Sequence, residues 1–390
     1  MNILFVSAIL PYPLHSGGQI RIYNLLKRLS DKHSITLLSF IRSKEENKYV
    51  KELSFCSHIE TVLRGKAMQL KYLLGAMGNY SWLLSTYNNQ EMKKIINFQL
   101  STFNFDLVHI EPFYVYPSLP PFSIPLIVSE HNVEYSIYEQ YVRKLPLSFL
   151  RPFLFLDVVK TRMWEETVWR KAAKLIAVAV EDKVVMQKIR EEIITVIPNG
   201  VDCEKYKYVQ KTLDGNNLRC LFIGDFAWLP NREAIKTLLQ HIWPKIHNQF
   251  PRATLTIVGK ELPQAMKKLL AQDILYRENV PDIQDIYQTH NILLAPMGIG
   301  GGSKFKLLEA FAAGLVIYTS KQGITGLLME SDRDYFEVKT PEDYVKSFKK
   351  MCSDTKKVHA MTFHARQIIE AEYNWNSIAE KLNKVWRSVA

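Results

Sequence analysis

Short apolar runs alternate with amphipathic segments along most of the chain. The first half has five nearly continuous apolar runs. Between the first and second runs, residues 20–29 have the apolar spacing of a helix, and residues 91–99 have it between the second and third runs. These runs predict buried strands at residues 3–6, 34–39, 107–109, 126–129 and 175–178. The alternation restarts after residue 217, with strands expected at residues 221–223, 254–258, 292–295 and 315–319 and helices at residues 232–246 and 263–271. Apolar strands separated by helices indicate parallel sheets covered on both faces, so we predict an α/β protein with two Rossmann-like doubly wound domains.

A turn-rich segment at residues 196–202 and a polar stretch at residues 203–217 separate the two series. We therefore place an N-terminal domain at residues 1–195 and a C-terminal domain at residues 196–372. The last segment, residues 373–390, contains a helix expected over residues 377–386, and we predict that it packs back on the N-terminal domain. A length of 390 residues suits two such domains.

The composition is that of an ordinary globular protein, with 47% hydrophobic and 23% charged residues. No run approaches the roughly 18 apolar residues that a membrane-spanning helix needs, and the four cysteines form no CxxC pair. We expect a cytoplasmic protein without disulfides or a zinc site. The net charge of +11 suits an anionic partner, but the basic residues form no stripe interleaved with aromatic residues. A phosphorylated ligand or an anionic membrane surface is therefore expected, and no nucleic acid.

A glycine-rich loop follows the strand expected at residues 292–295 and leads into an amphipathic helix. Its glycines let a ligand approach the backbone, and the helix start offers unpaired N–H groups to a phosphate. Lys304 and Lys306 add positive charge there, and the Glu309 carboxylate can accept two hydrogen bonds from a ribose diol. The loop contains Gly298, Gly300, Gly301, Gly302 and Ser303. This pattern predicts a nucleotide site; the alternative is a mobile surface turn before a helix.

Several motifs in a fixed order carry a family resemblance. They are Pro11 and Pro13 followed by Gly17 and Gly18, Phe105-Asp-Leu-Val-His109, Ser129-Glu-His-Asn-Val-Glu134, Val196-Ile-Pro-Asn-Gly-Val-Asp202, Phe222-Ile-Gly-Asp225 with Pro230-Asn231, and the glycine loop into Leu308-Glu-Ala310. From its first strand to about residue 375, the chain resembles the GT-B glycosyltransferases of the GT4-like group (glycosyl transferases group 1).

The resemblance implies two Rossmann-like domains facing a central cleft. It also implies a retaining transferase that uses no metal and no cofactor. The donor, a nucleotide-diphosphate sugar, would bind mainly to the C-terminal domain. The acceptor, a glycan or a lipid-linked glycan, would bind mainly to the N-terminal domain, in the synthesis of a surface polysaccharide or glycoconjugate.

The resemblance also assigns roles to residues. Glu309 matches the glutamate that binds the ribose, Gly300 to Ser303 match the loop near phosphate and sugar, and His131 matches a histidine that contacts the transferred sugar. The acceptor or cleft loop is expected to include Gly17, Gly18 and Glu111, and the nucleotide-sugar site to include Gly224, Asn231 and Arg232. Alternatives stand beside these roles: a satisfied strand-end histidine for His131, a structural His109 and a turn cap for Glu111. Arg21 and Arg232 could meet a phosphate, but a solvated helix face is the expectation for both.

The chain departs from the family pattern at two places. Where many members carry a first glutamate eight positions before Glu309, this chain has Gly301, and the arginine and lysine that often follow the strand ending at residue 223 are absent. Lys304 is our candidate replacement for the missing charge, so the catalytic set is His131, Lys304 and Glu309. The departures leave a noncatalytic nucleotide-sugar-binding scaffold as the alternative. A dehydrogenase is disfavoured because no G-x-G-x-x-G follows the first strand.

Two segments, residues 66–82 and 140–169, mix basic with aromatic and aliphatic residues. Such helices can lie on anionic membranes, which would suit a lipid-linked acceptor and a peripheral position at the inner face of a membrane. The alternative is that they are ordinary helices that cover a sheet, with a soluble sugar acceptor.

Overall fold

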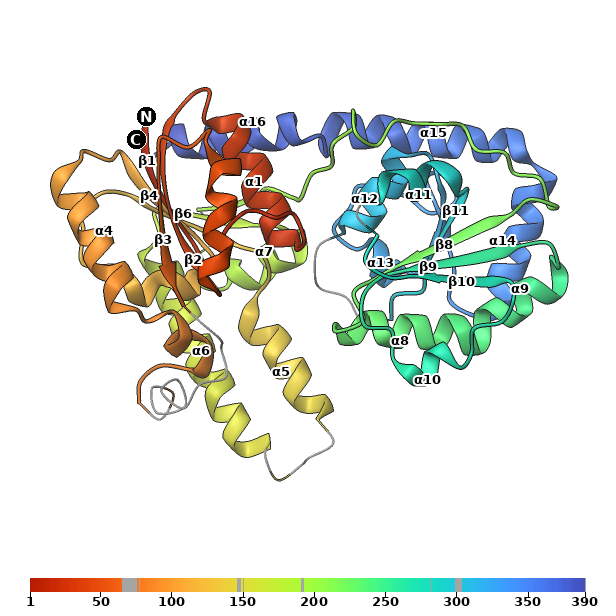
Figure 1. The fold of residues 1–390 in the computed structure, drawn as a ribbon, viewed down its shortest axis with the longest axis horizontal. Coiled ribbons are helices and arrows are strands. Elements are labelled where there is room, and N and C mark those ends of the chain that lie inside the picture. Colours follow the sequence, from red (N-terminus) through yellow and green to blue (C-terminus); the bar gives the residue numbers. More distant parts are fainter. Residues whose placement is uncertain are drawn as a thin grey trace. The chain divides into compact units, whose positions relative to one another are not determined.

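The computed structural model describes residues 1–64, 76, 78–145, 149, 151–190, 193–280, 282–298 and 304–389. The chain divides into two compact units, unit 1 with Met1–Asn199 and Trp375–Ala390 and unit 2 with Gly200–Asn374. Each unit is a parallel sheet with helices on both faces (Figure 1). The prediction of two doubly wound α/β domains is confirmed.

The sheet of unit 1 has seven strands in the order β3-β2-β1-β4-β5-β6-β7, and all of its pairs are parallel. The strands are β1 Asn2–Ser7, β2 Ser34–Ile41, β3 His58–Leu63, β4 Leu107–Glu111, β5 Leu126–Glu130, β6 Lys174–Ala177 and β7 Ile194–Val196. The helices are α1 Gly17–Leu29, η1 Lys44–Leu53, α3 Trp82–Tyr87, α4 Gln90–Thr102, η2 Phe113–Ser118, α5 Glu134–Lys144, α6 Arg151–Lys171, α7 Val180–Gln187 and α16 Trp375–Arg387. The strand order reverses between β1 and β4, and open α/β sheets bind ligands at the carboxyl ends of strands at such a point.

The sheet of unit 2 has six strands in the order β10-β9-β8-β11-β12-β13, also with parallel pairs throughout. The strands are β8 Arg219–Ile223, β9 Thr254–Val258, β10 Ile274–Arg277, β11 Ile292–Ala295, β12 Val316–Thr319 and β13 Phe336–Glu337. The helices are α8 Leu229–Thr237, η4 Leu238–Ile242, α9 Trp243–Gln249, α10 Gln264–Lys267, α11 Gln284–Thr289, α12 Phe305–Ala312, α13 Lys321–Ile324, α14 Pro341–Ser353 and α15 Thr355–Glu372. Here the order reverses between β8 and β11, which makes this the expected ligand end of unit 2.

The central strands are mostly apolar because both faces of each sheet are buried. In β11, Ile292 and Leu294 belong to one hydrophobic core, whereas Leu293 and Ala295 belong to the core on the opposite face. The helix predicted over residues 232–246 is confirmed as α8 and α9 joined by the π-helical η4. The helix predicted over residues 263–271 is wrong beyond the short α10; Leu269 is 38% exposed, so a further turn would bury little apolar surface.

The final helix belongs to unit 1. α16 packs against α1, and its Trp386 is fully buried. His33 Nε2 lies 2.7 Å from the Asn383 side-chain oxygen, and Arg28 Nε donates to Asn376 Oδ1 at 2.7 Å. The helix is therefore tied to unit 1 by apolar and polar contacts alike. Every helix in the described part of the chain is too short or too polar to span a bilayer.

Candidate active site

The first turn of α1 lies at the ligand end of the unit 1 sheet. Ser16 caps this helix in a capping box with Gln19, which fixes the helix start at Gly17. Gly17 and Gly18 therefore form the first turn of a helix rather than an open loop. A Cβ atom on Gly18 would lie 2.9 Å from Cε1 of His131, so only glycine lets this ring lie against the turn.

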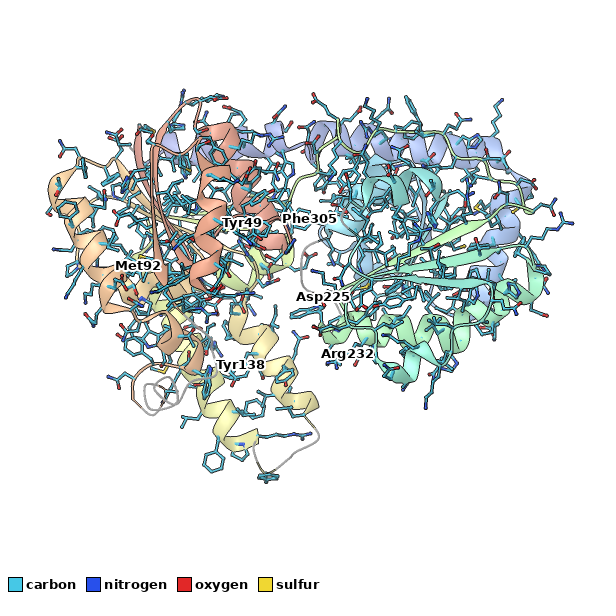
Figure 2. The ribbon with its side chains drawn as sticks, viewed as in Figure 1. Tyr49, Met92, Tyr138, Asp225, Arg232 and Phe305 are labelled. Carbon is cyan, nitrogen blue, oxygen red and sulfur yellow. The ribbon has the colours of Figure 1, made fainter. Side chains whose placement is uncertain are left out.

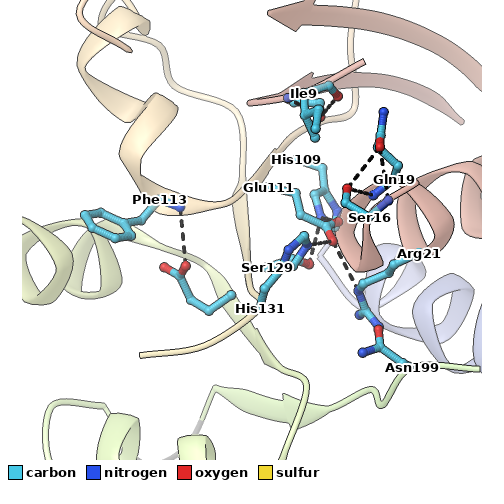
Figure 3. A network of polar contacts seen from close by, with 12 residues as sticks. Ile9, Ser16, Gln19, Arg21, His109, Glu111, Phe113, Ser129, His131 and Asn199 are labelled. Carbon is cyan, nitrogen blue, oxygen red and sulfur yellow. Dashed lines mark hydrogen bonds and ion pairs between the residues drawn. The ribbon is translucent and has the colours of Figure 1, made fainter. Parts of the chain in front are cut away.

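His131 directly follows β5 and points to Glu111, the last residue of β4 (Figure 3). Its Nε2 lies 2.5 Å from Oε1 of Glu111, and its side chain is 24% exposed. Arg21 Nε donates to the same oxygen at 3.1 Å. Burial raises the pKa of Glu111, but the neighbouring imidazoles of His109 and His131 and the charge of Arg21 outweigh this effect and hold the pKa below its ordinary value. Glu111 is thus a carboxylate that accepts hydrogen bonds from His131 Nε2 and Arg21 Nε.

His109 and Trp386 extend this network to the final helix. The indole N–H of Trp386 donates to His109 Nδ1 at 2.9 Å, so the ring proton of His109 must lie on Nε2. That nitrogen is 2.9 Å from Ser129 Oγ and 3.7 Å from Glu111 Oε2. Burial lowers the pKa of His109, in agreement with a neutral ring. His109 is structural, as one of our alternatives holds, and it also supports the carboxylate that binds His131.

Arg21 is not on a solvated helix face, and that expectation is wrong. Its side chain is 1% exposed, and Nη1 donates to the Pro198 carbonyl at 3.0 Å and to Asn199 Oδ1 at 3.4 Å. Glu111, Pro198 and Asn199 are far from Arg21 in the sequence, but their oxygen atoms accept hydrogen bonds from its guanidinium group and keep the side chain buried in unit 1. Arg232, in contrast, is exposed.

Glu309 lies in the second turn of α12, between two tyrosines. Tyr206 donates its hydroxyl to Oε1 at 3.1 Å, and Tyr287 donates to Oε2 at 2.8 Å. Burial raises the pKa of Glu309 to about 7 against the opposing effect of these hydrogen bonds. A carboxylate has about four acceptor positions, so both oxygens keep capacity for a ligand diol. Neither tyrosine was among the residues singled out from the sequence, because their positions carry no motif.

The lysines at the start of α12 point to different places. Lys304, the residue that caps α12, has its Nζ 3.5 Å from the Gln322 carbonyl. Lys306 instead donates to the Ile223 carbonyl and to Asn231 Oδ1, each at 3.0 Å. Lys306 thus reaches from the helix after β11 to the end of β8. Asp225, just after β8, and Phe305, the first residue of α12, lie at the same end of this sheet (Figure 2).

Gly224 and Asn231 form the support for Lys306. A Cβ atom on Gly224 would lie 2.9 Å from Cγ of Asn231, so glycine leaves room for this amide. Asn231 Nδ2 donates to the Asp225 carbonyl at 2.9 Å, which leaves its oxygen as the acceptor for Lys306. Of the expected nucleotide-sugar residues, the structure therefore brings Gly224 and Asn231 together with the start of α12. Gly300, Gly301, Gly302 and Ser303 lie outside the described residues.

Two family models match successive parts of the chain. The model described as Glycosyltransferase Family 4 matches residues 15–205, and the model described as Glycosyl transferases group 1 matches residues 217–354. An uncharacterized 44.6 kDa protein in the cps region of Klebsiella pneumoniae is 21% identical over 83% of this chain and 84% of its own length.

Solved structures share the fold over the whole chain. The sucrose-phosphate synthase of Thermosynechococcus elongatus has a TM-score of 0.76 at 14% identity, with 100% of this chain and 99% of that chain covered. HepE of Anabaena in complex with UDP has a TM-score of 0.65 at 16% identity, with both chains fully covered.

Proposed function

The chain belongs to the GT-B glycosyltransferases, with a family 4 domain followed by a group 1 domain, and we propose that it transfers a sugar from a nucleotide-diphosphate sugar to a glycan or lipid-linked acceptor with retention of configuration and without a metal. The observation that carries this proposal is the Glu309 carboxylate, held by two tyrosine hydroxyls on the helix that follows β11. A diol such as ribose matches its remaining acceptor positions. The same place in the sheet is where α/β folds bind nucleotides.

Positive charge for the leaving diphosphate comes from the chain itself. The first N–H groups of α12 point out of the helix start, and Lys304 and Lys306 lie in the same turn. Fixed dipoles and ammonium groups stabilise charge that develops on phosphate oxygens as the bond from the sugar carbon breaks. This arrangement supports metal-independent transfer.

The reaction needs no protein nucleophile. We assign the acceptor to unit 1, and His131 would contact a hydroxyl of the transferred sugar. The acceptor oxygen bonds to the anomeric carbon on the face that the diphosphate leaves, and the departing phosphate oxygen takes the acceptor proton. Glu111 keeps the ring of His131 in place through the bond to Nε2.

The structures of Anabaena HepE were obtained with UDP and with UDP-glucose, which makes a uridine nucleotide the first donor to try. The relative from the Klebsiella cps region supports a role in surface polysaccharide synthesis. The test is a panel of UDP-, GDP- and ADP-linked sugars, with binding measured by calorimetry and slow hydrolysis by release of nucleoside diphosphate. Turnover of one donor that Glu309→Ala weakens supports a transferase, whereas tight binding without turnover, with glycan and lipid-linked acceptors alike, supports the scaffold alternative.

An exposed stripe on α6 supports a lipid-linked acceptor and peripheral membrane contact. Phe153 is 74% exposed, Leu156 58% and Met163 62%, and their spacing places them on one helix face. Most of the other basic and aromatic segment, residues 66–82, lies outside the described residues, which leave out residues 66–75 and 77. Sedimentation with phosphatidylglycerol vesicles tests the contact: binding that the double change Phe153→Ser and Met163→Ser abolishes would support it, and no binding would favour a soluble acceptor.

A further inference from the structure

We propose that Lys306, rather than Lys304, is the residue that neutralises the leaving diphosphate, and this inference rests on the proposed function of unit 2 as the donor site. Lys306 lies in the first turn of α12, directly after the N-terminal residue Phe305. Its role is catalytic in the strict sense, since its ammonium group would contact the phosphate oxygens that leave. The sequence suggested Lys304 because that residue ends the glycine loop.

The Lys306 ammonium lies at the ends of two neighbouring strands. Its Nζ reaches the last carbonyl of β8 at 3.0 Å and lies 3.7 Å from Met297 Sδ, just after β11. The group therefore sits at the carboxyl ends of both strands between which the order reverses. A ligand that binds at this switch point meets Lys306 directly. Lys306 thus brings a positive charge to the end of β8 from the neighbouring helix.

The groups that accept hydrogen bonds from Lys306 are uncharged. The acceptors of Lys306 are a carbonyl, an amide oxygen and a thioether, and its ammonium also lies 5.4 Å from the centre of the Phe222 ring. Among the described residues, no carboxylate lies within ion-pair distance of it. The nearby Asp225 carboxylate accepts the Ala227 N–H at 2.9 Å instead.

A buried ammonium without a counter-charge costs free energy, which an anionic ligand would recover. Burial, together with repulsion from Lys304, lowers the pKa of Lys306 to about 8. A diphosphate would raise this pKa by supplying the missing negative charge. An anionic ligand would supply the counter-charge that the described residues do not offer Lys306.

Neighbouring residues hold the Lys306 ammonium in place. Asn231 fixes the ammonium through its amide oxygen, and the Asp225 carbonyl fixes the amide in turn. Gly224 is required for this arrangement, because a Cβ atom there would collide with Asn231. Preorganised charge stabilises a transition state better than charge that must first be ordered.

The experiment compares Lys306→Met, Lys306→Arg, Lys304→Met and the control Lys236→Met, which removes an exposed lysine of α8. The donor is whichever of the UDP-, GDP- and ADP-linked sugars the wild type turns over. We expect Lys306→Met to lower kcat by about 100-fold or more, and Lys304→Met by less than about tenfold. Affinity for the nucleoside diphosphate should fall in Lys306→Met, whereas affinity for the nucleoside, which has no phosphate, should not change.

A pH profile separates a charge role from a structural one. In the wild type, kcat/KM should fall above about pH 8 as Lys306 loses its proton, and Lys306→Arg should remove this alkaline limb because a guanidinium stays charged. Folding is checked by thermal unfolding; removal of an uncompensated buried charge should not destabilise unit 2.

Equal turnover by the wild type and Lys306→Met, or a larger loss in Lys304→Met, would overturn the inference while the donor site stands. A wild type that binds none of the nucleotide sugars would instead overturn the proposed function itself.

Discussion

Protonation of Glu309 should control donor binding below neutral pH. The pKa of Glu309 is raised to about 7 by burial, whereas a ribose diol needs the ionised carboxylate as a double acceptor. Other charged groups near it are Lys205 and Asp282, and the lowered pKa of Asp282 keeps it ionised in this range. A nucleotide sugar has no phosphate proton to gain near neutrality. The affinity for the donor should therefore follow the ionised fraction of Glu309.

The magnitude follows from the pKa. With a pKa of about 7, the ionised fraction is about 0.5 at pH 7.0 and about 0.03 at pH 5.5, so the dissociation constant should rise about sixteenfold between them. Isothermal titration calorimetry in two buffers of different ionisation enthalpy measures both the affinity and the protons that binding releases. Below pH 7, binding should release close to one proton per site.

Two variants make the prediction specific. Glu309→Gln should bind the donor weakly and with no dependence on pH between 5.5 and 7.0. Tyr287→Phe removes a hydrogen bond that lowers the pKa of Glu309, so its affinity should begin to fall at a higher pH than in the wild type. A wild-type affinity that stays flat over this range, or a Glu309→Gln variant with the wild-type slope, would refute the reasoning.

The raised pKa of Glu309 should also make the stability of unit 2 depend on pH. A carboxyl group whose pKa is raised on folding stabilises the fold fully below its unfolded pKa of about 4.5, and this contribution is lost as the pH rises through about 7. At pH 8 the ionised Glu309 therefore costs unit 2 up to about 3 kcal/mol. Glu309→Gln should raise the unfolding free energy at pH 8 and leave it nearly unchanged at pH 4.5, as measured by urea unfolding. An equal effect at both pH values would contradict the assignment.

Two glycine substitutions test the packing of the sites. Gly18→Ala should displace the His131 ring, since the new Cβ would lie 2.9 Å from Cε1. This variant should lower kcat/KM by at least about tenfold with little change in thermal unfolding. Turnover equal to that of the wild type would show that the ring position does not matter. Gly259→Ala would place a Cβ 1.8 Å from the Gly224 carbonyl oxygen, and it should cost about 3 kcal/mol in urea unfolding. Gly215→Ala, whose Cβ would find its nearest neighbour at 3.8 Å, is the control and should change stability by less than about 0.5 kcal/mol.

The central strands could be predicted from the sequence because both of their faces are buried. β11 is entirely apolar, and β1, β4 and β5 each contain a run of apolar residues for this reason. The edge strands β3 and β10 were missed, since most of their residues are at least partly exposed and the apolar run is lost. β13 has only two residues, too few for any pattern.

The site could be predicted only as far as local motifs reach. The glycine loop before α12 drew attention to Glu309, and the polar cluster after β5 drew attention to His131. The partners that determine their chemistry come from distant segments: Tyr206 precedes Glu309 by 103 residues, and Arg21 precedes Glu111 by 90. Helical spacing alone could not show that Arg21 faces a buried carboxylate.

Glu111 and Glu309 show why residue type alone does not define a site. Both lie at the ligand end of a doubly wound sheet. Glu111 receives hydrogen bonds from Arg21 and His131, whereas the described partners of Glu309 are two tyrosine hydroxyls. The imidazoles of His109 and His131 and the charge of Arg21 hold the pKa of Glu111 below its ordinary value, whereas burial raises that of Glu309 to about 7. Glu111 therefore stays ionised between pH 7 and pH 6, whereas Glu309 gains a proton over the same range. Loss of donor binding at Glu309 should consequently contribute to the acid limb of the transfer reaction.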